Sequence, residues 1–285
     1  MTSRPPTLLP RLRELGIAPR KGLGQHFLTD PNILDAIVAA AELPPDAVVI
    51  EVGPGPGALT AALAPVSSRL IAIELDDRLA PLLQDLYADW PQVHIIHADA
   101  LKISPADALE QTGGLAPYFV LGNIPYYITS PLLRHFLEAT PRPERVVSTI
   151  QLDVARRIVA RPPQMSLLAV SVQTYARPRI VRKLSPGAFT PPPKVHSAVL
   201  RLDMLPRPLV PPDQRQGFFR MVKAGFGQKR KTLRNSLAAG LGLPTSDVEA
   251  ALLAAGLHPK QRAQELSLPQ WLKLLSTLAS HADLG

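Results

Sequence analysis

The sequence lacks cysteine entirely, with none among its 285 residues. This absence excludes disulfide bonds, thiolate zinc sites and thiol nucleophiles. The chain also lacks any apolar run of about 18 residues, so no membrane span is expected. Its first 20 residues hold arginines and prolines but no apolar stretch typical of a secretory signal. We therefore expect a soluble, cytoplasmic protein.

What the chain does contain fits a globular protein of more than one domain. Apolar types make up 46% of the residues and charged types 19%, and this length allows a sizeable core. Proline is abundant, with 32 residues, but it clusters between stretches of regular apolar pattern. Such clustering favours rigid connections between packed elements over disorder.

Charge is distributed unevenly around the net value of +8. Residues 46–133 carry a net charge of −7, whereas residues 134–205 carry +8 and residues 206–285 carry +6. The densest basic segment has six cations and no acid: Arg220, Lys223, Lys229, Arg230, Lys231 and Arg234. This asymmetry indicates a polyanionic partner such as nucleic acid, while a solvated helix face is an equally open interpretation.

The first two thirds of the chain alternate between strand and helix patterns. An apolar run over residues 47–53 ends in glycines, as is typical of a buried parallel strand. Further strands are expected at residues 69–75, 93–98, 118–122, 145–150, 180–184 and 197–202. A helix is expected to start at Asp30-Pro31, where an N-cap residue precedes proline at the first helical position. Further helices are expected at residues 58–63, 78–87, 131–139 and 166–175. This alternation predicts an open α/β sheet with helices on both faces.

The pattern changes near residue 205. The proline-rich segment 205–212 is interpreted as a stiff linker. Helical patterns then follow over residues 213–225, 230–240, 246–255 and 269–279, without a convincing strand. The sequence thus predicts an α/β domain over residues 1–205 and a small all-α domain over residues 206–285.

A glycine-rich turn, Glu51-Val-Gly-Pro-Gly-Pro-Gly57, leaves the first strand and enters a helix. It permits a dinucleotide enzyme, a methyltransferase with a nucleoside cofactor, or a plain tight turn. Glu74 closes the next strand 21 residues after Gly53, where it can bind ribose hydroxyls. Pro54 and Pro56 weigh against a pyrophosphate, because each lacks a backbone N–H. Asp99, at the end of the third strand, can accept from an adenine amino group or act as a cap.

The segment Gly122-Asn-Ile-Pro-Tyr126 follows the fourth strand at the same edge. The Asn123 side chain and a backbone carbonyl next to proline offer two acceptors to one amino group. Tyr126 can stack on a base. Taken alone, an Asn-x-Pro sequence is more often a turn with a cap.

Together these motifs resemble the ribosomal RNA adenine N6-dimethyltransferases of the small subunit. The resemblance covers nearly the whole chain. It rests on residues 21–28, 51–60, 73–76, 99–101, 122–131, 189–195, 228–236 and 262–267. It implies a Rossmann-like class I methyltransferase sheet over residues 1–205 that binds S-adenosylmethionine. It also implies a small C-terminal all-α domain over residues 206–285 that binds RNA and the ribosome.

The resemblance assigns roles to individual residues. The residues expected to bind S-adenosylmethionine are Gln25, His26, Leu28, Gly53, Gly55, Glu74, Asp99, Ala100 and Asn123. Those expected to hold and stack on the target base are Asn123, Ile124, Pro125, Tyr126 and Phe189. The six cations of segment 220–234 are expected to bind RNA. His26 stands where the family usually has asparagine, and segment 161–166 is shorter than its family counterpart.

The implied activity is dimethylation of N6 in two adjacent adenosines, within a hairpin near the 3′ end of small-subunit (16S) rRNA. The implied partner is small-subunit rRNA in a pre-30S particle during ribosome biogenesis. A monomer is expected, with no metal and no membrane partner. Three alternatives are kept: a large-subunit rRNA adenine methyltransferase, a non-catalytic ribosome-assembly or transcription factor, and an NAD oxidoreductase. The last would need a catalytic His or Lys near the sheet edge, and the sequence supports none.

Overall fold

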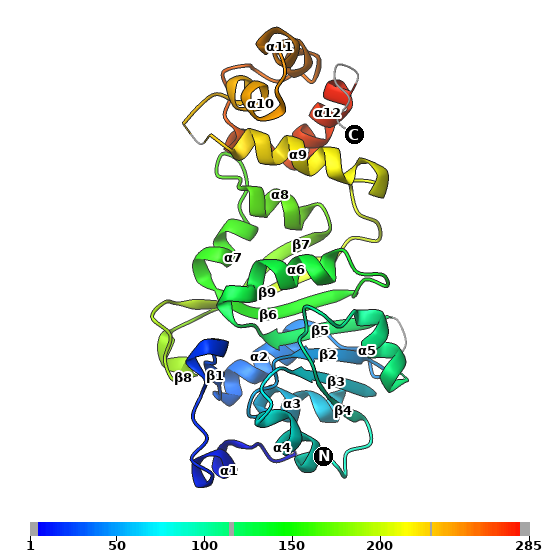
Figure 1. The fold of residues 1–285 in the computed structure, drawn as a ribbon, viewed down its shortest axis with the longest axis vertical. Coiled ribbons are helices and arrows are strands. Elements are labelled where there is room, and N and C mark those ends of the chain that lie inside the picture. Colours follow the sequence, from blue (N-terminus) through cyan, green and yellow to red (C-terminus); the bar gives the residue numbers. More distant parts are fainter. Residues whose placement is uncertain (1–4, 114–116, 229, 280–285) are drawn as a thin grey trace. The chain divides into compact units, whose positions relative to one another are not determined.

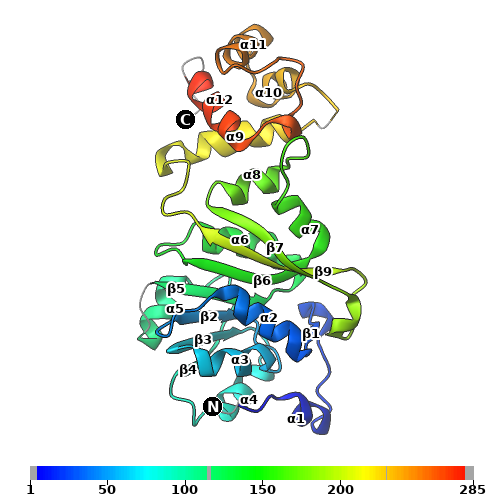
Figure 2. The same cartoon turned by 180° about the vertical axis from the view of Figure 1, so that it is seen from behind.

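The computed structural model describes residues 5–113, 117–228 and 230–279 (Figures 1 and 2). The chain forms two compact units. The first takes in the chain up to Ala155 together with Pro178–Met204, and the second takes in Arg156–Arg177 together with the chain from Leu205 on. Each unit contains its own hydrophobic core.

The first unit is built on a mostly parallel sheet. Its strands are β2 (Val48–Val52), β3 (Arg69–Glu74), β4 (Val93–His97), β5 (Tyr118–Asn123), β6 (Arg145–Gln151), β7 (Ala176–Leu184) and β9 (Ser197–Met204). Their order in the sheet is β4-β3-β2-β5-β6-β9-β7. The pairs from β4 to β6 are parallel, and β9 joins β6 antiparallel. The strand pattern of the sequence is confirmed, including the two late strands.

Helices cover both faces of this sheet. They are α1 (Leu9–Glu14), α2 (Pro31–Ala41), α3 (Ala58–Leu63), α4 (Leu79–Leu86), α5 (Pro105–Thr112) and α6 (Thr129–Leu137), followed by α7 (Leu152–Ile158), which runs into the second unit. The two views place α2 and α6 on opposite faces of the sheet (Figures 1 and 2). The predicted open α/β sheet is therefore confirmed.

Burial on both faces explains why the central strands are continuous apolar runs. In β2, Val49 belongs to the core shared with α2, α3 and α4, while its neighbour Ile50 points to the other face. Both side chains are fully buried. At the end of β5, a Cβ on Gly122 would lie 2.6 Å from the Val52 carbonyl oxygen. Glycine thus lets β5 lie against β2 where the site begins.

A short second sheet lies beside the carboxyl end of the main one. β1 (Phe27–Leu28) pairs antiparallel with β8 (Phe189–Thr190). β1 is the last part of a segment, residues 20–28, that we call the strap. The strap begins with one 3₁₀ turn, Lys21–Leu23, and reverses at Gly24 with φ +60°. The β1–β8 pairing ties the strap to the hairpin between β7 and β9.

Apart from loops and the first two residues of β7, the described residues of the second unit are helical. Its helices are α8 (Leu167–Gln173), α9 (Arg215–Phe226), α10 (Leu233–Leu241), α11 (Thr245–Ala254) and α12 (Leu268–Ala279). Their apolar faces meet around the fully buried Trp271 and Phe218. The helix expected over 230–240 begins later, at Leu233, because the Thr232 side chain caps it by accepting from the Asn235 N–H.

The second unit also contains residues 156–177, which the expected boundary at residue 205 assigned to the first domain. The reason is packing, since Met165, Ala169 and Val170 are buried among the side chains of α9 to α12. The predicted linker is likewise held by this unit: Leu209 N–H donates to the Thr174 carbonyl at 2.9 Å, and Val210 is buried. In the described part of the chain, no helix has both the length and the apolar character needed to cross a membrane.

Candidate active site

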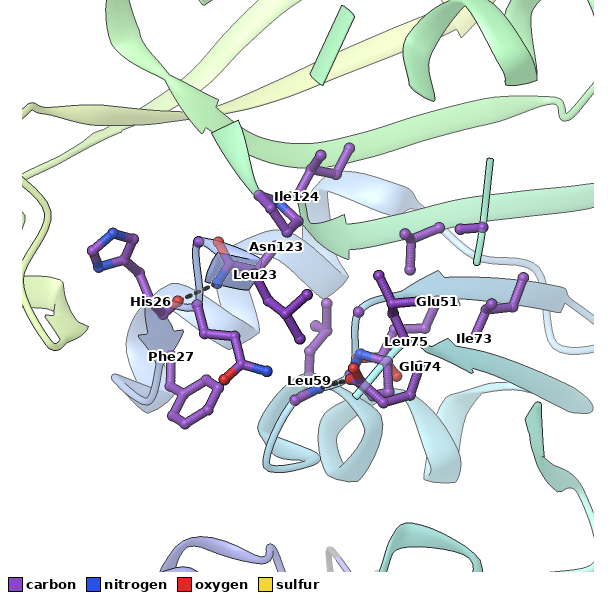
Figure 3. A pocket seen from close by; sticks show the side chains of 18 of the residues that line it. Leu23, His26, Phe27, Glu51, Leu59, Ile73, Glu74, Leu75, Asn123 and Ile124 are labelled. Atoms are coloured by element: carbon purple, nitrogen blue, oxygen red, sulfur yellow. Dashed lines mark hydrogen bonds between the residues drawn. The ribbon is translucent and has the colours of Figure 1, made fainter. Parts of the chain in front are cut away.

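A pocket opens at the carboxyl ends of β2, β3, β4 and β5 (Figure 3). Its walls are the strap, the glycine loop (residues 53–57), and the turns that follow β3, β4 and β5. The residues that line it are 23–28, Leu34, 51–56, 58–59, 73–75, 98–100 and 123–128. In open α/β sheets this edge is where ligands bind. All of the residues expected to bind the cofactor line this one pocket.

The glycine loop needs glycine at each of its three positions. Gly53, Gly55 and Gly57 have φ of +68°, +56° and +80°, which side chains rarely adopt. A Cβ on Gly55 would also lie 3.2 Å from the Phe27 ring. The loop therefore turns tightly under the strap, and its backbone lies against the pocket.

Glu74 holds the glycine loop in place. Its Oε2 accepts from the Gly55 N–H at 2.9 Å, and its Oε1 accepts from the Asp76 N–H at 2.8 Å. The side chain is buried, and this burial raises the pKa of Glu74. Each carboxylate oxygen keeps a further lone pair, so the carboxyl can still accept from a ribose hydroxyl.

Asp99 and Ala100 line the pocket after β4. The Asp99 Oδ1 accepts from the Leu101 N–H at 2.9 Å, which makes it a turn cap. Its side chain remains 30% exposed, with Lys102 at 4.0 Å from Oδ2. Both interpretations of Asp99, cap and pocket acceptor, are therefore compatible with its position.

Gln25 anchors the strap through both ends of its amide. Its Oε1 accepts from the Arg20 N–H at 2.7 Å, and its Nε2 donates to Asp76 Oδ2 at 2.9 Å. Asp76 is fully buried and also pairs with Arg78 at 2.7 Å. Burial favours the neutral form of Asp76, but the hydrogen bonds from Arg78 and Gln25 outweigh it and lower its pKa to about 2.

Asn123 links the strap to the end of β5. Its Nδ2 donates to the His26 carbonyl oxygen at 2.6 Å, as Figure 3 shows. This bond fixes the amide so that Oδ1 remains an acceptor. Ile124 follows, with a buried side chain, and then Pro125. The two acceptors expected from this sequence, Asn123 Oδ1 and a backbone carbonyl, therefore belong to a fixed turn at the pocket.

The His26 ring is turned away from the pocket (Figure 3). Its Nδ1 lies 2.7 Å from the Pro191 carbonyl, and because a carbonyl can only accept, Nδ1 carries the proton. The ring also stacks on Tyr126, with centroids 6.0 Å apart. His26 thus contributes its backbone carbonyl to the site, while its side chain holds the loop after β8.

The two aromatic residues expected to stack on the target base differ in position. Tyr126 lines the pocket and its hydroxyl lies 2.6 Å from the Ser197 hydroxyl. Phe189 does not line the pocket: it is 3% exposed and belongs to the core. The β1–β8 pairing places Phe189 opposite Leu28, which turns its ring inward. The stacking role expected for Phe189 is not tested by this geometry and stays a prediction.

Sequence reasoning missed three residues of the site. Tyr127 lines the mouth of the pocket and is 58% exposed. Glu51 lines the pocket from below the glycine loop, and Asp76 holds the strap. Glu51 and Asp76 both lie inside motifs noted in the sequence. An acidic residue at or just after the end of a buried strand could therefore have identified them as site residues.

The cations of segment 220–234 lie in the second unit. Arg220 and Lys223 are exposed on α9, and Arg230 and Lys231 are exposed between α9 and α10. Arg234 is half-buried and pairs with Glu249 at 2.7 Å. Lys229 lies outside the described residues. The phenylalanines of α9 pack on the core of this unit.

Comparison with known proteins agrees with this geometry. The family model described as ribosomal RNA adenine dimethylase matches residues 17–280. The chain is 43% identical over 273 residues to Ribosomal RNA small subunit methyltransferase A of Dehalococcoides mccartyi strain CBDB1, covering 94% of this chain and 93% of the relative. It is 40% identical over 281 residues to the protein of the same name from Moorella thermoacetica, covering 96% and 97%.

Solved structures agree as well. The 23S rRNA methyltransferase ErmE is 32% identical, with a TM-score of 0.71 over 89% of this chain and 99% of that one. A dimethyladenosine transferase from Plasmodium falciparum, 24% identical, shares the fold with a TM-score of 0.73 over 90% and 98%. The fold is thus that of a class I rRNA methyltransferase. By its sequence and by the glycine loop and Asn123 turn that meet at one pocket, the chain belongs to the ribosomal RNA adenine dimethylase family.

Proposed function

We propose that this protein dimethylates N6 of two adjacent adenosines in a hairpin near the 3′ end of small-subunit rRNA, with S-adenosylmethionine as methyl donor. The observation that carries the proposal is the Asn123 turn. Its Nδ2 is held by the His26 carbonyl, which leaves Oδ1 as an acceptor beside a pocket suited to a nucleoside cofactor.

The charges of the pocket favour this cofactor over a dinucleotide. Glu51, Glu74 and Asp99 all line it, and none of its described lining residues is Lys or Arg. The Glu51 Oε2 is buried and has no hydrogen-bond partner among the described residues. A pyrophosphate would meet carboxyl groups here, and Pro54 and Pro56 offer it no N–H. A ligand with positive charge fits this set of groups.

The residues of this chain promote the reaction by binding and orienting the cofactor and the target amino group. When bound, S-adenosylmethionine supplies an electrophilic methyl group on a sulfonium. We assign its ribose to Glu74 and its adenine to the Asp99 side. Asn123 Oδ1 and the Ile124 carbonyl accept from the target amino group and favour a more tetrahedral nitrogen, whose lone pair attacks more readily. In-line displacement then depends on alignment more than on a general base.

The target base must leave its helix or hairpin to reach this pocket. Tyr126 and the exposed Tyr127 stand at the turn where such a base would enter. Aromatic rings stack on any base face, at about 1–3 kcal/mol per base. We therefore assign base stacking to Tyr126 and Tyr127, and keep Phe189 as a further aromatic residue expected at the target base.

The exposed cations of the second unit support an RNA-binding role for that unit. Arg220, Lys223, Arg230 and Lys231 are available to phosphates, whereas Arg234 is shared with Glu249. The small subunit is favoured because the relatives with 40–43% identity carry its name, above the 32% of the large-subunit enzyme. We propose a monomer that acts on pre-30S particles in the cytoplasm, without a metal.

The proposal is tested by labelled methyl transfer. Purified protein, labelled S-adenosylmethionine and small subunits that lack the modification should yield dimethyladenosine in small-subunit rRNA. Large subunits from the same cells serve as the control substrate and should stay unlabelled. Transfer only to large-subunit rRNA would assign the protein to the second enzyme class, and binding of the subunit without any transfer would favour an assembly factor.

A further inference from the structure

Two neighbouring tyrosines, Tyr126 and Tyr127, line the pocket but are held in different ways. The Tyr126 ring stacks on the His26 ring, with the ring planes 21° from parallel, and its hydroxyl lies 2.6 Å from that of the fully buried Ser197. Tyr127 is 58% exposed, and it is the only aromatic residue among the large apolar side chains that the described part of the chain exposes. Tyr126 is therefore fixed, whereas more than half of Tyr127 is open to solvent.

A single base cannot stack on both rings. Tyr126–Ile128 forms one turn of 3₁₀ helix, in which successive side chains point about 120° apart. The Tyr127 side chain therefore leaves the turn in a different direction from that of Tyr126. Because Tyr126 serves the target base beside the Asn123 turn, the Tyr127 ring is left for a different group of the substrate.

The strap supports the Tyr127 ring from one side. Gly24 has a φ of +60°, and a Cβ there would lie 3.3 Å from both Cδ1 and Cε1 of Tyr127. The backbone of the strap thus lies against the ring, and glycine leaves the space for it. A ring that is supported on one side and open on the other is the arrangement on which nucleobases stack.

The turn of the strap that supports Tyr127 also carries a cation. Lys21 begins this 3₁₀ turn, and its carbonyl accepts from the Gly24 N–H at 3.0 Å. Lys21 is exposed. An open aromatic ring and an exposed cation on adjoining segments suit a nucleotide, which presents a base and a phosphate, better than an apolar peptide.

We propose that Tyr127 and the strap form a second base subsite, which binds the nucleotide next to the target adenosine while that adenosine occupies the pocket. The inference deepens the proposed function and rests on it, since it takes two adjacent adenosines as the substrate. When one of them is in the pocket, the other is its immediate neighbour. Tyr127 thus determines which nucleotide context is bound, and Tyr126 serves the base that reacts.

Fluorescence of the neighbouring base tests the contact directly. Small subunits are assembled with rRNA whose 3′ hairpin is a ligated synthetic segment, in which one of the two adenosines is replaced by 2-aminopurine. This fluorescent base lacks the 6-amino group, so the remaining adenosine is the target, and each position is substituted in turn. Binding of the wild-type protein with S-adenosylhomocysteine should quench the fluorescence in one of the two arrangements, because stacking on a tyrosine ring quenches 2-aminopurine. Tyr127→Ala should lose this quenching and Tyr127→Phe should retain it. Equal quenching by the wild type and Tyr127→Ala, or none in either arrangement, would overturn the inference.

Transfer kinetics separate a contact with this base from a role in the fold. With unmodified subunits, Tyr127→Ala should raise the KM for the subunit at least about fivefold, the low end of what one base–aromatic stack is worth. The single-turnover rate at saturating subunit should change by much less, since the stack persists from the ground state to the transition state. An abasic residue in place of the neighbouring base should raise the wild-type KM by a similar factor, and Tyr127→Ala should then add nothing further. Leu15→Ala, which changes an exposed apolar residue outside the pocket, is the control and should keep the wild-type KM on both substrates. A Tyr127→Ala defect that persists in full on abasic subunits would contradict the inference.

Failure of this inference is distinguishable from failure of the proposed function. Methyl transfer by the wild-type protein with no dependence on the neighbouring base contradicts the role of Tyr127 and leaves the methyltransferase proposal standing. No transfer to unmodified subunits contradicts both. Should Tyr127→Ala not fold, Tyr127→Leu takes its place in both assays, because leucine keeps an apolar side chain beside Gly24 but has no ring on which a base can stack.

Discussion

The Asn123 amide is oriented by a backbone carbonyl. Free asparagine amides can turn over and exchange their oxygen and nitrogen, but the 2.6 Å bond from Nδ2 to the His26 carbonyl permits one orientation. The acceptor atom is thereby fixed before substrate arrives. Such preorganisation is worth most when the bond strengthens in the transition state.

Removing that acceptor should slow the chemical step more than binding. Asn123→Ala is expected to lower the single-turnover rate of methyl transfer by about 100-fold, the typical loss for one preorganised hydrogen-bonding group. The dissociation constant for S-adenosylmethionine, measured in parallel by calorimetry, should change by much less. Asn32→Ala, on the exposed start of α2, is the control and should retain the wild-type rate. An unchanged rate in Asn123→Ala would contradict the acceptor mechanism.

Asp76 stabilises the fold through its charge. Its pKa is lowered to about 2 in the folded protein. Its contribution to the free energy of unfolding is therefore complete above its unfolded-state pKa near 4, and it is lost as the pH falls through about 2. Asp76→Asn should therefore lower the free energy of unfolding at pH 7 by about 2 kcal/mol. Urea denaturation at several pH values measures the free energy of unfolding. The difference in this free energy between Asp76→Asn and the wild type should narrow below pH 4. Asp77→Asn, an exposed neighbour paired with Arg20, should cost less than about 1 kcal/mol.

At the scale of elements, the strap joins three parts of the first unit. It contacts Asp76 through Gln25, Asn123 through the His26 carbonyl, and β8 through backbone pairing. Its residues were expected to bind the cofactor directly. The structure shows that Gln25 and the His26 ring also anchor the strap, while their contact with the cofactor stays a prediction.

Removing the hydrogen bonds of Gln25 should accelerate amide hydrogen exchange in the strap. Gln25→Ala removes two hydrogen bonds, to Arg20 and Asp76, each worth about 1 kcal/mol. Amide exchange in residues 20–28 should accelerate at least about fivefold, while the central strands stay protected. Gln92→Ala is the matched control, because it removes one hydrogen bond to the Ala64 carbonyl, away from the strap. Equal acceleration in both variants would show that the strap is not held by Gln25.

Elements with a strong local signal were predictable from sequence. The apolar run that became β2 and the Asp30-Pro31 start of α2 depend on neighbouring residues alone. The burial of Phe189 could not be predicted, because it depends on β8 pairing with β1, about 160 residues earlier in the chain. For the same reason, local pattern cannot show that Val170 packs with the C-terminal helices, or that a carbonyl of the strap orients Asn123.

At the scale of the whole molecule, acidic and basic residues are concentrated in different parts of the chain. Residues 46–133, which supply most of the pocket, carry a net charge of −7, and residues 206–285 carry +6. The acidic part suits a cationic cofactor, and the basic part suits RNA. Each unit has its own core, so changes to the basic helices should leave cofactor binding intact.

RNA binding by the basic segment should depend on salt. Replacing Arg230 and Lys231 with glutamine should weaken binding of small-subunit rRNA and reduce the slope of log affinity against log salt by about 1.4–1.8. Arg234→Gln should reduce that slope by less, since Arg234 already pairs with Glu249. Filter binding at several salt concentrations measures both. A slope unchanged by the double substitution would show that these cations form a solvated face only.

The central claim is tested most directly by counting and locating the methyl groups. Unmodified small subunits are incubated with the protein and S-adenosylmethionine, and rRNA fragments near the 3′ end are analysed by tandem mass spectrometry. We predict four added methyl groups, two on N6 of each of two adjacent adenosines. Asn123→Ala, expected to be about 100-fold slower, should add almost none in an incubation just long enough for the wild-type protein to finish. Methyl groups at any other position, or the same four with Asn123→Ala, would contradict the account.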